Sequence, residues 1–208
     1  MKLILASDYT FLLKYGYNLT GIPKDKMRIG HIITATKGTG KSFNPKYKMI
    51  IEENGYQLDS FDIENKSEGE IRNFLKDKNI IQMEGGNTFY LLKIIRETGF
   101  DGILKDLINE GKVYIGTSAG SYVMCPSIVV AVWNHDAVAV DRCGVTDFTA
   151  LNYVPFVLRV HYKDEMREEV KERRKTLKYP LRILRDGQGI LVEDNKYTFM
   201  GDGEEVKL

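Results

Sequence analysis

Residues 111–124 read GKVYIGTSAGSYVM, and they place a serine directly after an apolar run. The apolar residues 113–117 predict a buried strand, and the residues after Ser118 favour the start of a helix. Gly116 and Gly120 lie two positions before and after this serine, so the segment matches the pattern G-x-S-x-G. In a nucleophile elbow, this pattern turns a strand sharply into a helix and exposes the serine hydroxyl. The stretch therefore predicts either a nucleophile at Ser118 or a tight turn that only requires small residues.

The first 124 residues alternate short apolar runs with amphipathic segments. Such alternation predicts βαβ units and a mostly parallel sheet. Strands are predicted at 2–7, 30–36, 56–63, 79–86 and 113–118, and helices at 45–55, 67–77, 87–100 and 101–111. The runs before Gly85 and Ser118 are almost wholly apolar, which favours positions at the centre of the sheet. Ser67 and Glu70 have the spacing of a capping box at the start of a helix.

After Pro126 the pattern changes. Residues 127–140 are rich in β-branched side chains and suggest β-rich connections, a helix is predicted at about 163–177, and residues 189–201 suggest a terminal hairpin. We therefore expect an α/β fold with a mostly parallel central sheet and flanking helices. All of it is expected to form a single domain over residues 1–208.

The composition is that of an ordinary globular protein, because 43% of the 208 residues are hydrophobic and 28% are charged. A net charge of +1 gives no reason to expect a nucleic acid or a membrane surface as a partner. Cys125 and Cys143 are too few for a disulfide framework and lack the spacing of metal ligands. We expect a cytoplasmic protein that needs no metal or organic cofactor.

Residues 35–42, ATKGTGKS, look like a phosphate-binding loop. That motif requires a glycine where this chain has Ala35. Pro45 also falls where the helix of the motif should already be running. We therefore favour a loop that binds no nucleotide.

A nucleophilic serine needs a base, and the chain offers three histidines. His31 lies inside a predicted strand and is expected to be structural. His135 lies in a polar break, where a surface position is plausible. His161 ends an apolar run, and the carboxyl ends of strands are where sites form in open α/β sheets. Position alone leaves His161 open as either the base or a structural residue.

A second glycine pair, Gly85 and Gly86, ends a predicted strand and opens a predicted helix. Exposed backbone N–H groups at such a turn can complete an oxyanion hole. We expect Gly86 to serve opposite the N–H of Ala119, which follows Ser118 at the start of the next helix. Asn87 fits a helix cap, and we also count it among the substrate-binding candidates.

Five segments now form a recognisable set. They are GGNTFYLL at 85–92, GTSAGS at 116–121, CP at 125–126, LNYVPF at 151–156 and HY at 161–162. In this order they resemble the dipeptidase E family, the alpha-aspartyl dipeptidases, whose relatives include cyanophycinase. The resemblance extends from the first predicted strand to the terminal hairpin. It implies a three-layer, flavodoxin-like fold similar to class I glutamine amidotransferase domains.

The resemblance implies a catalytic triad with Ser118 as nucleophile and His161 as base. The acid of the family lies in a turn that matches LRDGQGI at 184–190, which makes it Asp186 where the family carries glutamate. An acid that is shorter by one methylene can still orient an imidazole, provided that the backbone comes closer. Without the resemblance, the chain order of α/β-hydrolases would favour Asp147 as the acid.

Two further residues are implied for substrate binding. Asp136 matches an aspartate of the family and could pair with a free peptide N-terminus. Arg167 falls near the arginine of the family, and a guanidinium suits the side-chain carboxylate of an N-terminal aspartate. The segment between His161 and the acid is shorter than in the family, so Arg159 and Arg173 stay open as rivals.

The sequence thus predicts a serine peptidase that hydrolyses short peptides with a free N-terminus, Asp-X dipeptides above all. Two alternatives stay open. One is a hydrolase of the same fold with another substrate, such as a cyanophycinase-like enzyme or another aminopeptidase. The other is a non-catalytic binding homologue. The expected partner is a small peptide, and the chain is expected to act as a monomer or a homodimer.

Overall fold

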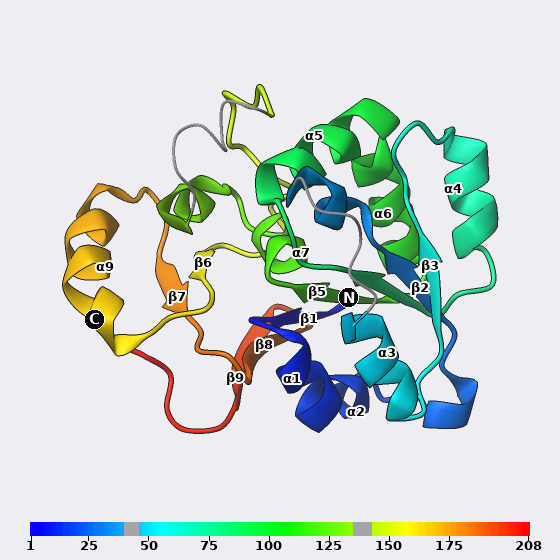
Figure 1. Cartoon of the computed structure of the whole chain (residues 1–208), viewed down its shortest axis with the longest axis horizontal. Coiled ribbons are helices and arrows are strands. Elements are labelled where there is room, and N and C mark those ends of the chain that lie inside the picture. Colours follow the sequence, from blue (N-terminus) through cyan, green and yellow to red (C-terminus); the bar gives the residue numbers. More distant parts are fainter. Residues whose placement is uncertain (40–45, 135–142) are drawn as a thin grey trace.

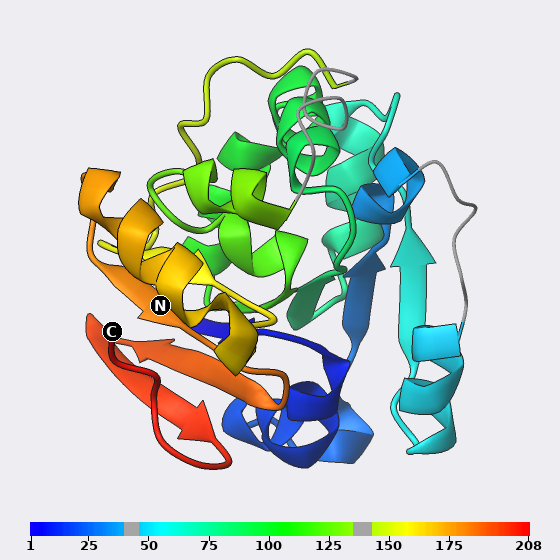
Figure 2. The same ribbon diagram turned by 60° about the vertical axis from the view of Figure 1, so that its left-hand side comes forward.

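The computed structural model of the chain describes residues 1–39, 46–134 and 143–208 (Figure 1). A seven-stranded sheet forms its centre, in the order β3-β2-β4-β5-β1-β8-β9. The first five of these strands run parallel, and β8 and β9 add an antiparallel edge. The strands are β1 Lys2–Ala6, β2 Ile29–Ile32, β3 Leu58–Phe61, β4 Ile80–Met83, β5 Val113–Thr117, β8 Gln188–Glu193 and β9 Lys196–Gly201. Figure 2 shows β3 at one edge and the β8–β9 hairpin at the other.

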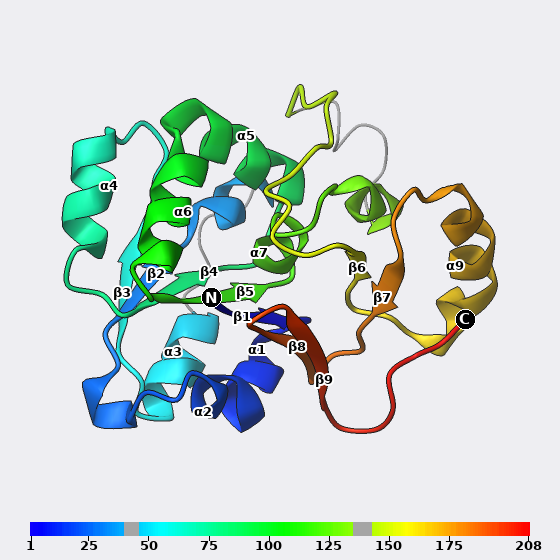
Figure 3. The same cartoon turned by 180° about the vertical axis from the view of Figure 1, so that it is seen from behind.

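Helices cover both faces of the sheet, which gives the expected three-layer α/β fold (Figure 3). One face carries α1 Tyr9–Phe11, α2 Tyr17–Leu19 and α3 Lys46–Glu53, and the other carries α4 Glu68–Leu75, α5 Thr88–Thr98, α6 Phe100–Asn109 and α7 Ala119–Tyr122. Successive strand residues face opposite layers. Ile80 accordingly packs in the cluster with Phe11 and Tyr17, whereas Ile81 packs in the cluster with Phe89. None of the described helices is long and apolar enough to cross a membrane.

Several sequence predictions are confirmed. Strands β4 and β5, which end before Gly85 and Ser118, occupy the third and fourth of seven positions in the sheet. Helix α4 begins at the predicted capping box, in which the Ser67 hydroxyl accepts the Glu70 N–H and the Glu70 carboxylate accepts the Ser67 N–H at 2.9 Å. The carboxylate accepts hydrogen bonds from the Ser67 backbone N–H, which has the largest effect, and from the Ser67 hydroxyl and Lys66, and these lower the pKa of Glu70 to about 2. The helix predicted at 163–177 is α9 Arg167–Arg173, flanked by short 3₁₀ turns.

The prediction of β-rich connections after Pro126 is wrong for the described part of that segment. Val129–Asn134 forms a 3₁₀ helix, and Val130 and Ala131 are buried in the core. The run of β-branched residues suggested a strand. Burial of those side chains beside α7, rather than pairing with another strand, determines the local structure here. Only an isolated bridge between Ser127 and Thr149 forms in this region of the described chain.

Two regions differ from the predictions: the helical residues 9–19 were not predicted, and the strand expected to end before His161 pairs with a second strand that was not predicted. Residues 9–19 form α1 and α2, joined by a π-helical turn at Leu12–Gly16, and Asp8 caps them by accepting the Phe11 N–H. Two short parallel strands, β6 Val157–Arg159 and β7 Leu181–Ile183, form a separate small sheet. This small sheet and α9 lie beside the carboxyl end of the main sheet (Figure 1). His161, which follows β6, therefore comes close to Ser118 at the end of β5.

Close packing of α7 against the sheet explains the small residues around Ser118. A Cβ atom on Gly116 would lie 2.5 Å from the Gly120 carbonyl oxygen, and one on Gly120 would lie 2.8 Å from Met83 Cβ. Both distances are far below van der Waals contact. The two glycines therefore allow β5 to turn directly into α7 with the helix resting on β4.

Replacement of Gly120 by alanine should destabilise the fold, because the added methyl group overlaps the backbone of Met83. We expect Gly120→Ala to lower the free energy of unfolding by about 1–3 kcal/mol, measured by urea denaturation. The control is Gly102→Ala in α6, where a Cβ would meet nothing within 4 Å. That control should raise the free energy of unfolding by up to about 1 kcal/mol. Equal stability of Gly120→Ala and the wild type would show that the contact is not tight.

Candidate active site

Ser118 occupies the strained position of the turn between β5 and α7. Its backbone has φ of +47° and ψ of −105°, a region that non-glycine residues rarely adopt. The Ser118 N–H donates to the Ala6 carbonyl oxygen at 3.0 Å, which ties the turn to the end of β1. The Ser121 hydroxyl contacts the carbonyl oxygens of Ala6 and Gly116 at 2.8 Å each. These contacts hold the serine in place although its own conformation is unfavourable.

His161 follows β6, and its ring faces Ser118. The distance from His161 Nε2 to Ser118 Oγ is 3.0 Å, and that from Nδ1 to Asp186 Oδ1 is 2.6 Å. An ionised carboxylate can only accept, so in the neutral imidazole Nδ1 carries the proton and Nε2 is an acceptor. The Ser118 hydroxyl therefore donates to Nε2. This is the tautomer that a base for the serine proton requires.

Asp186 reaches the imidazole although it is shorter than glutamate. Its turn is drawn toward β1, because the Gly187 N–H donates to the Asp8 carboxylate at 2.9 Å. The Gln188 side chain accepts the Arg185 N–H at 2.8 Å and shapes the same turn. The hydrogen bond from His161 lowers the pKa of Asp186 below its usual value, against an opposing effect of partial burial. The acid is therefore ionised at neutral pH.

The glycine pair lies directly against the serine. A Cβ on Gly85 would lie 3.2 Å from Ser118 Cβ. Gly86 has φ of +147°, and a Cβ there would overlap the backbone of Ala35, so this position requires glycine. Within the described part of the chain, neither Gly86 nor Ala119 donates a backbone hydrogen bond through its amide. These two amides can accordingly bind an external oxygen atom.

Glu84 is a contributor to this region that the sequence did not indicate. Its carboxylate accepts the Gly85 N–H at 3.1 Å and lies 2.6 Å from His31 Nε2. His31 is fully buried and also contacts the Ser60 hydroxyl, in agreement with its predicted structural role. Because the Gly85 amide already donates to Glu84, Gly86 is the amide of the pair without a hydrogen-bond acceptor among the described residues.

Asn87 forms the N-cap of α5. Its Oδ1 accepts the N–H groups of Phe89 and Tyr90, and its Nδ2 donates to the Gly38 carbonyl oxygen at 2.9 Å. The capping interpretation of Asn87 is confirmed. A contact of Asn87 with substrate stays a prediction. Asn87 is only 5% exposed, and both polar atoms of its side chain already form hydrogen bonds within the protein.

The three arginine candidates have different surroundings. Arg167 is exposed at the start of α9, and its guanidinium forms no hydrogen bond or ion pair with a side chain or carbonyl group among residues 1–39, 46–134 and 143–208. Arg173 pairs with Glu169 at 3.0 Å, and Arg159 is 3% exposed with Nη2 3.1 Å from Met166 Sδ. Of the three, Arg167 has the guanidinium best able to meet a ligand.

Two acidic candidates lie elsewhere. Asp147 accepts the Thr149 N–H at 2.9 Å and pairs with Arg96 at 3.2 Å, so it belongs to a surface turn and not to the triad. Asp136 lies outside the described residues, and so does His135. The glycine-rich segment 35–42 that resembles a phosphate-binding loop begins in the 3₁₀ helix Thr34–Thr39, and its residues 40–42 also lie outside the described chain.

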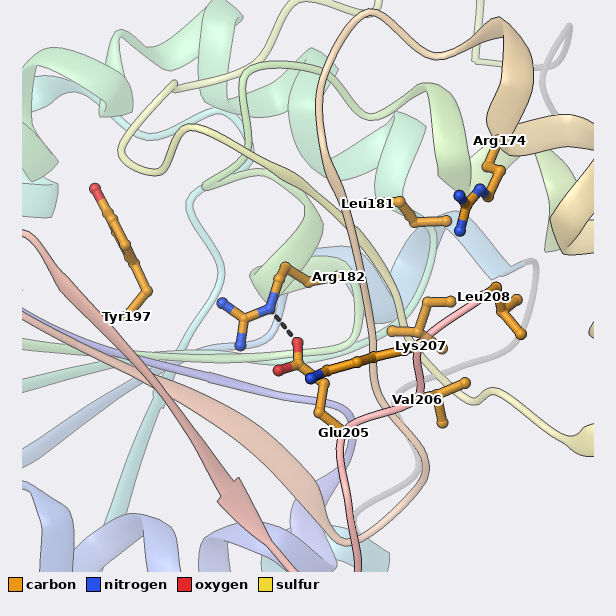
Figure 4. Close-up of a pocket in the computed structure, with 9 residues that line it drawn as sticks. Arg174, Leu181, Arg182, Tyr197, Glu205, Val206, Lys207 and Leu208 are labelled. Carbon is orange, nitrogen blue, oxygen red and sulfur yellow. Dashed lines mark hydrogen bonds and ion pairs between the residues drawn. The ribbon is translucent and has the colours of Figure 1, made fainter.

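A cavity of about 520 Å³ lies between β7 and the C-terminal segment (Figure 4). Arg182 and Glu205 form an ion pair on its wall, and Arg174, Tyr197 and Lys207 also line it. None of the predicted site residues lines this cavity. It is therefore separate from the group around Ser118.

The chain is similar to known peptidases along most of its length. A model of peptidase family S51 matches residues 18–200. The uncharacterized peptidase PM1590 of Pasteurella multocida is 30% identical over 207 residues, which cover 97% of this chain and 98% of that protein. Peptidase E of Escherichia coli O1:K1 / APEC is 36% identical over 104 residues, which cover 48% of this chain and 43% of that protein.

A solved structure is also similar. It is the crystal structure of a candidate Peptidase E protein from Listeria monocytogenes EGD-e, with a TM-score of 0.79 and 25% identity over 97% of this chain and 98% of that one. The family model covers far more than half of the chain, and the Pasteurella relative covers nearly all of it. The chain therefore belongs to peptidase family S51 and is a serine-type peptidase.

Proposed function

We propose that the chain hydrolyses short peptides with a free N-terminus, Asp-X dipeptides above all, by means of the triad Ser118, His161 and Asp186. The observation that carries this proposal is the hydrogen-bonded series at the elbow. Ser118 Oγ lies 3.0 Å from His161 Nε2, and His161 Nδ1 lies 2.6 Å from Asp186 Oδ1. Both distances are within the reach that a nucleophile, its base and the orienting acid require.

In the acylation step, His161 Nε2 accepts the Ser118 proton while Oγ attacks the carbonyl carbon of the substrate. The carbonyl π electrons move to oxygen, and the N–H groups of Gly86 and Ala119 bind the resulting oxyanion. The C–N bond then breaks, and the imidazolium gives its proton to the leaving amine. Asp186 stays ionised throughout and stabilises the positive charge on the imidazolium.

In the deacylation step, a water molecule takes the place of the amine. His161 accepts a proton from the water, whose oxygen attacks the ester carbonyl and forms a second tetrahedral intermediate. When this intermediate collapses, the bond to Ser118 Oγ breaks and the serine recovers its proton from the imidazolium. The carboxylic acid product leaves, and the triad returns to its starting state.

Preference for an N-terminal aspartate requires a cation for its side chain. Arg167 supports this part of the proposal, because its guanidinium is exposed and no described residue pairs with it. A planar guanidinium can bind a carboxylate through two parallel hydrogen bonds. Recognition of the free amine is assigned to Asp136 on the basis of the sequence alone.

Removal of the nucleophile should abolish hydrolysis without unfolding the protein. We expect Ser118→Ala to lower kcat on a dipeptide substrate by about 10⁴-fold or more, with unchanged circular dichroism. A fluorophosphonate probe should label the wild type and not this variant. Hydrolysis by Ser118→Ala at the wild-type rate would refute the triad, and a wild type that neither hydrolyses nor becomes labelled would favour a binding protein.

Variants of Asp186 that change its charge or its length give a second test of the triad. Asp186→Asn should lower kcat by about 10⁴-fold, because an amide no longer selects the productive tautomer of His161. Asp186→Glu should lower kcat by about 10- to 100-fold, because the turn is fixed for the shorter side chain and a displacement of about 1 Å is costly. Steady-state kinetics of both variants decide the point. Full activity of Asp186→Glu would show that the turn adapts to either acid.

The substrate cation can be identified with a panel of Asp-X, Ala-X and Leu-X dipeptides. Arg167→Ala should lower kcat/KM for Asp-X by about 10- to 100-fold, the effect of one lost bond between charged groups, and should leave Ala-X unaffected. The matched control is Arg173→Ala on the same helix, whose guanidinium pairs with Glu169. A selective loss in the Arg173 variant instead would transfer the role to that residue. Equal rates on all three dipeptides would indicate a broader aminopeptidase.

A further inference from the structure

We propose that Ser7 is a positioning residue that holds the base and the acid of the triad in register; this inference rests on the proposed function. Ser7 is the first residue after β1 and is fully buried. Its N–H donates to the Gln188 carbonyl oxygen at 2.9 Å, which joins it to the first residue of β8. Ser7 is therefore anchored at the carboxyl end of β1, beside β8.

The Ser7 hydroxyl contacts two members of the triad at once. Its oxygen lies 3.0 Å from Asp186 Oδ1 and 3.0 Å from the His161 backbone nitrogen. A hydroxyl has one proton to donate and can accept, whereas a backbone N–H only donates. The Ser7 proton must therefore go to the carboxylate, and the His161 N–H must go to Ser7 Oγ. Asp186 Oδ1 thus accepts both this proton and the one on His161 Nδ1.

Both partners of Ser7 need an external support. His161 has φ of +54°, a backbone conformation that residues other than glycine rarely adopt. The Asp186 side chain is 57% exposed and lies on a turn, where water competes for its oxygens. A buried hydroxyl that bonds to both fixes the backbone of the base relative to the carboxylate of the acid.

Ala6 and Asp8, the residues on either side of Ser7, also form hydrogen bonds with the segments that carry the proposed triad. The Ala6 carbonyl oxygen accepts the Ser118 N–H, and the Asp8 carboxylate accepts the Gly187 N–H. Three consecutive residues therefore contact the three chain segments that carry Ser118, His161 and Asp186. Ser7 is the one of the three whose side chain bonds to both the base and the acid of the triad.

The test compares Ser7→Ala with a matched control. We expect Ser7→Ala to lower kcat on the dipeptide substrate by about 10- to 100-fold with KM within about 2-fold, because ground-state binding does not involve this hydroxyl. Thr20→Ala is the control, since the Thr20 hydroxyl is also buried, donates to one group and accepts one backbone N–H. It should lower the melting temperature and leave kcat unchanged. If Ser7→Ala does not fold, Ser7→Cys takes its place in the test. The cysteine side chain has nearly the same volume as serine, but its thiol is a weak hydrogen-bond donor.

A double-mutant cycle separates positioning from general destabilisation. If Ser7 acts through Asp186, then Ser7→Ala should change kcat by less than about 3-fold in the Asp186→Asn background. Additive losses would overturn the proposal. So would a kcat of Ser7→Ala within 2-fold of wild type, or an equal loss of kcat in Thr20→Ala.

A spectroscopic measurement keeps this inference separate from the substrate assignment. The proton between His161 Nδ1 and Asp186 should give a far-downfield proton NMR resonance, assigned by its loss in Asp186→Asn. We expect this resonance to weaken or shift in Ser7→Ala and to persist in Thr20→Ala. A weakened or shifted resonance in Ser7→Ala supports the positioning role even if the protein hydrolyses no dipeptide. The absence of hydrolysis would count against the proposed function alone. An unchanged resonance in Ser7→Ala would overturn the role of Ser7.

Discussion

The close contact between α7 and the ends of β4 and β5 is the constraint on which the site depends. Because Gly116 and Gly120 have no side chains, the helix can begin within one residue of the strand, and Ser118 must take a conformation that exposes its hydroxyl. The same contact brings the amide of Ala119 beside the Gly85–Gly86 turn at the end of β4. Packing between three elements thus determines where the proposed nucleophile Ser118 and the proposed oxyanion donors Gly86 and Ala119 lie.

Asp186, the acid of the proposed triad, shows how a short side chain can reach an imidazole. Asp186 is one methylene shorter than the glutamate expected from the resemblance, and its turn lies correspondingly close to the end of β1. The Gly187 N–H and the Asp8 carboxylate provide that approach through a bond of 2.9 Å. The distance between the carboxylate and the imidazole therefore depends on the backbone turn as much as on the length of the side chain. Residue identity alone does not predict it.

The sequence predicted the parts of this protein that depend on local pattern. Alternating apolar runs gave the parallel strands and the order of helices, and the elbow motif singled out Ser118. It failed where tertiary packing overrides local preference, as in Val129–Asn134, whose β-branched residues are buried in a 3₁₀ helix. Contacts between residues far apart in the sequence, such as that of Glu84 with His31, leave no periodic signal. Residues 9–19 were missed although Asp8 is a good N-cap, because no regular apolar spacing followed it.

The position of β1 has a consequence for how the protein reaches its active form. This strand pairs with β5 and β8, which lie far from it in the sequence. Contacts between such distant segments slow folding, because a long loop must close before they form. Ser7 directly follows β1, and Asp186 lies two residues before β8, so the contact between them requires these two strands to pair. Until that pairing forms, the residues of the proposed triad are not held together, and the site exists only in the folded chain.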